Sequence, residues 1–397
     1  MGAHRAAHQR PVRRGAAIVL IVIAVVVALC SVAVRAQPGQ TETPAAPAHS
    51  LAALVERLRA KPLDGNVLDE ARGVGVELLR AGRFDDAARL FGVIREVAPL
   101  DRATLYGGAL AHFNLKRMGE AEEWARAAIG SAPRTATGSA PRTATGSAPR
   151  PETGGVGVTA QQQPGERSFG NVSDAHVLLG VVLAVKGDNA GALEAVTRAV
   201  EVAPDNFDAQ LALGRALYGA GDPAAASRAF RAAVSLRPGH ATARFFLATT
   251  LEGAGDDEGA LAAYRELIAA RPEMAEGHLG VGVLLVKRSG GATNAEAVRE
   301  LERALALDGN LYEGRVALGR ALIRAGRATD AVEHLKRAAE LAPRNPEPHY
   351  QLAVAYRRLG RKAEAERESA IVRGLHEEHR GGPVSKTGAG AASKPNQ

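Results

Sequence analysis

The chain has 397 residues and a formal net charge of +7, with 46% hydrophobic but only 4% aromatic residues, which favours helices packed through alanine over a core of large side chains. The excess positive charge lies in the first 35 residues, in a low-complexity stretch and in the C-terminal tail, so the slightly acidic remainder excludes the basic surface of a nucleic-acid-binding protein. The single cysteine, Cys30, excludes an intramolecular disulfide and a cysteine-based metal site.

The N-terminal 36 residues predict export. Residues 15–34 are uncharged and apolar, and as a helix they would span roughly 30 Å, the thickness of a bilayer core. Four arginines precede this run and only Arg35 follows it, which places the N-terminus in the cytoplasm and the rest of the chain across the membrane. Two fates remain open: an uncleaved inner-membrane anchor, or a signal peptide cleaved after Ala36, which would leave the protein periplasmic or secreted.

A polar, proline-bearing spacer covers residues 37–49. Ser50 is then a candidate N-cap for a short amphipathic helix over residues 51–60, which ends before Pro62.

The remaining sequence is organised around a 34-residue period, clearest from Phe207 to His240. This stretch predicts two amphipathic helices that meet at Gly221-Asp222-Pro223 and stop at Pro238. A period of this size indicates a stack of helical hairpins. The pattern predicts eight units, which start at Leu68, Arg102, Ser173, Phe207, Ala241, Ala275, Tyr312 and Pro346.

Two stretches interrupt or follow this array. Residues 134–171 are rich in Pro, Thr, Gly and Gln and contain three copies of GSAPR, so they predict a disordered linker. Residues 380–397 predict a disordered basic tail after a six-unit segment at 172–379. The segment at 50–133 holds only two units, which are too few to be stable alone. We therefore expect it to dock on the six-unit array, with the linker looped out.

Three recurring features carry a resemblance to the tetratricopeptide repeat (TPR). Small residues stand where the two helices of each unit cross: Gly75, Ala109, Gly180, Gly214, Ala248, Gly282, Gly319 and Ala353. An alanine opens the core stripe of each second helix: Ala87, Ala121, Ala192, Ala226, Ala260, Ala297, Ala331 and Ala365. Proline closes most units, at Pro99, Pro133, Pro204, Pro238, Pro272 and Pro343, with Gly309 as a departure. The resemblance implies an all-α, right-handed solenoid of about eight hairpins.

The resemblance also implies a concave groove, lined by the first helix of each unit, that binds peptide segments. Carried onto this sequence, the groove candidates are Leu211, Arg215, Tyr218, Phe245, Thr249, Leu279, Val283, Val316, Arg320, Tyr350, Val354 and Arg357. An apolar floor with spaced arginines predicts a peptide with apolar anchors and a few carboxylates. The alternative is that these side chains only pack between neighbouring helices. The Lys/Asn clamp of chaperone-binding relatives is not seen, since Val177 and Val181 stand at two of its positions.

Catalytic and metal motifs are weak throughout. The string HEEH at residues 376–379 resembles a zinc-protease helix, but its histidines are three residues apart instead of four. His176, His278 and His349 recur at one repeat position, and we interpret them as surface or packing residues. We therefore predict no enzyme activity, cofactor or metal.

The sequence as a whole predicts a non-catalytic scaffold that binds other proteins in the cell envelope. The alternative is a structural accessory subunit of a membrane-bound envelope enzyme complex that handles polysaccharide or proteolysis.

Overall fold

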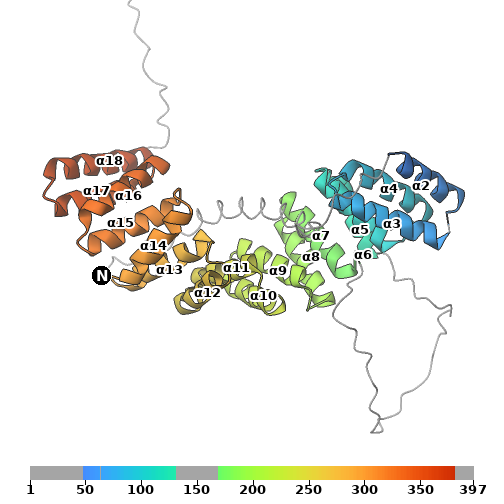
Figure 1. Ribbon diagram of the computed structural model, residues 1–397, viewed down its shortest axis with the longest axis horizontal. Helices are drawn as coiled ribbons and strands as arrows, with labels where there is room; N and C mark the ends of the chain where they lie inside the picture. Colours follow the sequence, from blue (N-terminus) through green and yellow to red (C-terminus); the bar gives the residue numbers. More distant parts are fainter. Residues whose placement is uncertain (1–47, 63, 131–168, 381–397) are drawn as a thin grey trace, which may run out of the picture. The chain divides into compact units, whose positions relative to one another are not determined.

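The computed structural model describes residues 48–62, 64–130 and 169–380, and all regular structure within them is helical (Figure 1). Contacts divide the chain into two compact units, which meet in the sequence between Leu236 and Arg237. Unit one holds α2 (Ala48–Ala60), α3 (Gly65–Arg80), α4 (Phe84–Val97), α5 (Arg102–Asn114), α6 (Met118–Gly130), α7 (Val172–Val185), α8 (Asn189–Val202), α9 (Phe207–Gly219) and α10 (Pro223–Leu236). Unit two holds α11 (Ala241–Gly253), α12 (Asp257–Ala270), α13 (Ala275–Arg288), α14 (Ala295–Leu307), α15 (Tyr312–Arg324), α16 (Ala328–Leu341), α17 (Pro346–Arg358) and α18 (Lys362–Arg380).

From α3 onward the helices pair as hairpins, and six of the eight begin at the residue that the period predicts. The exceptions are α3, which begins three residues before Leu68, and α7, which begins one residue before Ser173. The helix predicted over residues 51–60 is α2, and it begins three residues earlier than predicted, at Ala48. Ser50 therefore lies inside its first turn and is not the N-cap.

The predicted membrane segment, at residues 15–34, lies outside the described residues, as do most of the spacer, the linker and the tail. Among the helices that the structure does describe, none is both long enough and apolar enough to cross a membrane.

The small residues at the helix crossings have the expected role. A Cβ atom at Gly214 would lie 2.7 Å from the ring of Phe230, and one at Gly319 would lie 2.5 Å from Leu335 Cγ. The alanines at the predicted core positions of the second helices are all buried. Backbone contact through glycine and alanine therefore lets a few larger side chains fill the core.

A repeated hydrogen bond ties the start of four consecutive repeats to the junction before them. Gln210, Arg244, His278 and Arg315 occupy one repeat position, and each side chain bonds the carbonyl oxygen six residues earlier, at 2.7–3.0 Å. Three of these carbonyls belong to the junction prolines, and the fourth belongs to Gly309. Because the carbonyl makes this contact, the junction tolerates Gly309 in place of proline.

Within unit one, α6 packs directly against α7, although residues 131–168 separate them in the sequence. Lys186 Nζ lies 2.5 Å from Glu122 Oε2 across this contact, and Phe169 packs edge-on against Tyr106 at 5.2 Å between ring centroids. Asn171 caps α7 through its side chain. The predicted linker, which extended to Asn171, is therefore too long at its end: an aromatic contact and a helix cap order residues 169–171.

Candidate functional site

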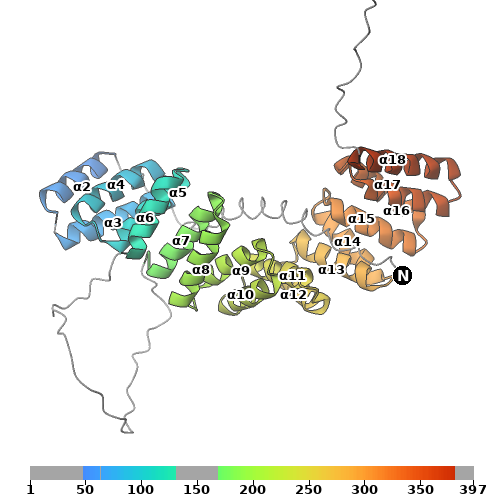
Figure 2. The ribbon, with the colours of Figure 1, turned by 180° about the vertical axis from the view of Figure 1, so that it is seen from behind.

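The first helices of unit two line one face of the stack. α13 contacts α11 and α15, and α15 contacts α17, whereas contacts between second helices are sparser. Figure 2 shows the hairpins of unit two following one another from yellow to red. Closer approach on the first-helix side makes that side the inner one of a curved stack. α15 also packs on α14 and α16. Its accessible residues Glu313 and Arg320 lie on the inner side, which none of these neighbours covers and which we call the first-helix face.

α13, α15 and α17 each expose one stripe on this face, and most of their other residues are buried. On α13 the accessible residues before the helix C-terminus are Glu276, Leu279 and Val283. On α17 the stripe contains Glu347, Tyr350, Val354 and Arg357, and on α15 it contains Glu313 and Arg320. The stripes follow i, i+3 and i+7 spacing, as one side of a helix requires.

The structure places most of the predicted apolar floor on the first-helix face. Leu279, Val283 and Val354 are half-buried, and Tyr350 is 52% exposed. Val316 is a correction, because it is only 8% exposed. α13 and α17 flank its helix on both sides, and a valine side chain is too short to extend past them.

The predicted arginines of unit two also lie on this face. Arg320 is half-buried and Arg357 is exposed. Within the described residues, neither side chain forms an ion pair or a hydrogen bond, in contrast to Lys287, which pairs with Asp257 at 2.7 Å. Arg324 likewise donates to the carbonyl of Val286 at 2.9 Å. Arg320 and Arg357 are therefore the cations that the fold itself leaves available here.

At the first hairpin of unit two, the face is polar. Thr249 Oγ1 lies 3.3 Å from the hydroxyl of Tyr264, which donates to Glu252 Oε2 at 3.3 Å. Burial, and then the charge of Glu252, raises the pKa of Tyr264, so this hydroxyl stays a donor at neutral pH. Phe245 beside it is half-buried and packs on the core.

In unit one the candidates are less accessible. Leu211 is buried, with 5% exposed, and Arg215 and Tyr218 are half-buried. Leu211 therefore contributes to packing and is a second correction to the predicted floor, because α9 buries this side of its first turns against α7 and α8.

The family model described as Tetratricopeptide repeat matches residues 75–136, 177–226 and 211–275, and one described as TPR repeat matches residues 319–360. Together these matches cover about half of the chain. The chain belongs to the tetratricopeptide repeat family. No curated protein matches its sequence.

Solved TPR structures share the fold. The C-terminal part of a TPR repeat-containing protein from Cytophaga hutchinsonii is 13% identical, with a TM-score of 0.51, and the match covers 71% of this chain and 99% of that one. PilF of Pseudomonas aeruginosa is 18% identical over 52% of this chain and 92% of its own, with a TM-score of 0.45. YrrB, described as a TPR protein with an unusual peptide-binding site, is 20% identical over 47% and 95%, with a TM-score of 0.41.

Sequence reasoning missed two features of this TPR array. The first is the set of three glutamates, Glu276, Glu313 and Glu347, that begin the accessible stripes. Their signal was available, since each is the second residue of its helix. The second is Tyr264, which stands where other second helices carry Phe91 and Phe230. Its hydroxyl reaches the first helices because a glycine, Gly280, makes room for the ring.

The recurring histidines serve the fold. His278 Nδ1 lies 2.6 Å from Glu300 Oε2, and His349 Nδ1 lies 2.7 Å from Glu368 Oε2. His176 has no such partner, and burial lowers its pKa. Among the described residues, no group of three His, Cys, Asp or Glu is placed to hold a metal, and His376, Glu377 and Glu378 are exposed on α18.

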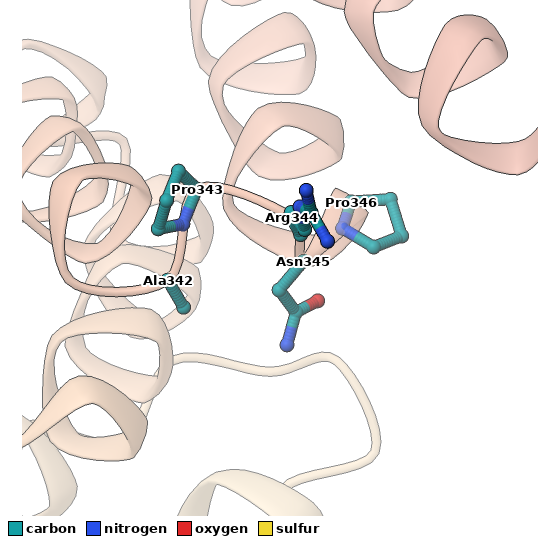
Figure 3. A pocket seen from close by; sticks show the side chains of 5 residues that line it. All are labelled: Ala342, Pro343, Arg344, Asn345 and Pro346. Atoms are coloured by element: carbon teal, nitrogen blue, oxygen red, sulfur yellow. The ribbon is translucent and has the colours of Figure 1, made fainter. Parts of the chain in front are cut away.

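A separate surface depression of about 580 Å³ lies at the junction of α16 and α17 (Figure 3). Five consecutive residues, 342–346, line it, from the loop after α16 to the first residue of α17, and their side chains do not converge on one point. Asn345 is already engaged, since its side chain accepts from the Glu347 backbone N–H at 3.0 Å. We therefore place the candidate site on the first-helix face and not in this depression.

Proposed function

We propose that this TPR protein is a non-catalytic scaffold that binds protein segments on the first-helix face and works in the cell envelope. Membership of the TPR family makes it a protein–protein interaction scaffold. The observation that carries the choice of surface is Tyr350. It is 52% exposed on a face where Val354, one turn along the same helix, and Leu279, on α13, are half-buried.

An exposed tyrosine suits binding better than folding. Its ring buries a large apolar area in an interface, and its hydroxyl keeps a polar partner or water. Accessible apolar residues of the same face stand on α13 and on α17, on either side of α15, so a partner segment laid across the three helices would cover several at once. Single exposed apolar residues are ordinary, whereas a supported row of them favours a docking surface.

The experiment is a crosslinked pull-down from membranes with the full chain and two variants. Tyr350→Glu places a charge on the first-helix face, and Ile371→Glu places the same charge at an exposed apolar position of α18. We expect Tyr350→Glu to lose partners that Ile371→Glu retains, with unchanged helicity in both. Retention of the same partners by Tyr350→Glu would contradict the proposal. It would favour the alternative, a structural arm of a membrane-bound enzyme complex.

The envelope location is supported by residues 15–34 and the arginines before them. Protease added to spheroplasts should digest the repeats, and protection of the repeats would contradict export. The mass of the N-terminal peptide then separates the two fates, because cleavage after Ala36 leaves Gln37 as the first residue.

A further inference from the structure

We propose that the partner of the first-helix face is an amphipathic α-helix with lysine or arginine along one flank, an inference that rests on the proposed function. It adds a basic flank to the expectation, drawn from the apolar floor and its arginines, of a peptide with apolar anchors and a few carboxylates. The inference combines three observations on unit two: an acidic edge, an apolar strip and two arginines with no ion pair in the described structure.

The acidic edge consists of Glu276, Glu313 and Glu347, one from each of α13, α15 and α17. In the described structure no lysine or arginine pairs with Glu276 or Glu347, and Glu347 accepts only an amide hydrogen bond, from Gln351 at 2.9 Å. Burial, and then the charges of Glu347 and Glu313, raise the pKa of the neighbouring Tyr312 to about 12.

Acidic residues at helix N-termini also stabilise their own helices through the helix dipole, so these three carboxylates are not a site by themselves. Their significance comes from the register. Glu276 starts the accessible stripe that continues into Leu279 and Val283, and Glu347 starts the one that continues into Tyr350 and Val354. On α15 between them, Val316 is only 8% exposed and the stripe continues from Glu313 to Arg320. A segment that covers the apolar strip therefore places one of its flanks against the glutamates.

The side of the face away from the glutamates carries positive charge. Arg320 stands in the same row as Val283 and Val354, at the far edge of the strip, and Arg357 lies about one turn beyond that row on α17. Arg320 follows Glu313 by seven residues and Arg357 follows Glu347 by ten, which corresponds to about 10 and 15 Å along the helix axis. A helix with its side chains is about 10–12 Å wide. A partner helix laid across the strip therefore meets carboxylates on one side and guanidinium groups on the other.

The spacing along the face favours a helix over an extended strand. The axes of packed neighbouring helices lie about 8–10 Å apart, which sets the interval between successive glutamates. Lysines seven residues apart on a partner helix are about 10.5 Å apart and stay on nearly the same side. In a strand the same distance is about three residues, which turns successive side chains to opposite faces.

The test uses two synthetic helical peptides of about 21 residues, roughly the reach of three heptads, and the full chain. The first peptide has a leucine stripe, lysines at i, i+7 and i+14 on one flank and glutamates on the other. In the second, glutamine replaces the lysines. The protein variants are the triple change Glu276→Gln, Glu313→Gln, Glu347→Gln and a matched control, Glu333→Gln, Glu366→Gln, Glu378→Gln. The control removes three exposed acids from α16 and α18.

By fluorescence anisotropy, we expect the wild-type chain and the control variant to bind the lysine peptide about tenfold more tightly than the glutamine peptide. The acidic-edge variant should bind both peptides alike. Equal binding of the two peptides by the wild-type chain, or no binding of either, would overturn the basic-flank partner. The pull-down with Tyr350→Glu distinguishes a failure of this inference from a failure of the proposed function. If that variant loses captured partners while the peptides do not bind as expected, the first-helix face is still a docking surface and only the basic-flank partner is wrong.

Discussion

At the scale of the residue, the close helix crossing is the most demanding feature of this TPR array. At Gly319, a Cβ atom would lie 2.5 Å from Leu335 Cγ, and Leu335 is fully buried. We predict that Gly319→Ala lowers the free energy of unfolding by about 1–3 kcal/mol, the usual cost of overpacking a core. Chemical denaturation followed by far-ultraviolet circular dichroism measures this change.

The matched control is Gly374→Ala in α18 of the same unit, where a new Cβ atom meets no other heavy atom within 4 Å. Alanine is the better helix former, so this variant should be unchanged or more stable by up to about 1 kcal/mol. Equal destabilisation of the two variants would show that the crossing contact does not limit packing.

The sequence predicted the role of a residue correctly where only one physical cause can account for the residue type at that position. Glycine or alanine at the crossing has a steric cause that recurs in every unit, so the period alone locates it. Tyr264 shows the limit. Its register matches that of Phe91 and Phe230, so the sequence predicts a core ring, and only the structure shows its hydroxyl beside Thr249 and Glu252.

At the scale of the element, Asn206 couples a helix cap to a buried polar cluster. Its side-chain oxygen accepts from the backbone of Asp208 at 3.0 Å and of Ala209 at 3.3 Å. Its amide donates to Ser173 Oγ and Asp174 Oδ1, both at 2.9 Å. Asn206→Ala should cost about 2 kcal/mol of unfolding free energy, because it removes the cap and takes a donor from the buried Ser173 hydroxyl and the half-buried Asp174 carboxylate.

Two further variants separate the cap from the cluster in the same denaturation measurement. Asn345→Ala removes an exposed cap alone and should cost about 1 kcal/mol. Asn206→Asp keeps the cap acceptor but brings a carboxylate to Asp174, so it should be destabilised at neutral pH and recover on acidification. A cost for Asn206→Ala no larger than that for Asn345→Ala would mean that the cluster contributes nothing.

The sequence predicted the helices better than it predicted their ends. Proline and glycine mark the turns inside the array, so the starts of α9 and α11 follow from the period. Outside the array no period exists, and α2 begins at Ala48, before the expected cap. Phe169 could not be placed for a different reason. It follows a low-complexity stretch, and its partner Tyr106 is more than sixty residues earlier in the sequence.

At the scale of the whole molecule, family membership and repeat register follow from the sequence, whereas the accessible surface does not. Leu211 and Val316 occupy the same repeat position as Tyr350, yet only the tyrosine is exposed. Among residues at the same repeat position, the length of the side chain and the packing of the flanking helices decide which ones reach solvent. The acidic edge also emerges only when neighbouring helices are seen together, since each glutamate alone is an ordinary first-turn residue.

The arrangement of unit one leads to a prediction about its continuity. α6 and α7 pack together, and one hydrophobic cluster includes Trp124 and Ala128 of α6 with Leu178 and Leu179 of α7. The covalent connection through residues 131–168 is therefore not needed to hold the two sides together. We predict that a chain cut at a protease site inserted in this segment elutes as one species in size-exclusion chromatography, with an unchanged melting temperature.

Separate elution of the N-terminal fragment would contradict this prediction. The variant Lys186→Ala identifies the force involved, because it removes the ion pair to Glu122 and leaves the apolar cluster intact. Exposed ion pairs contribute about 0–1 kcal/mol, so the cut Lys186→Ala chain should still elute as one species. TPR hairpins bury their apolar faces only against neighbours, so loss of the α6–α7 contact would leave the N-terminal hairpins without the support that an array requires.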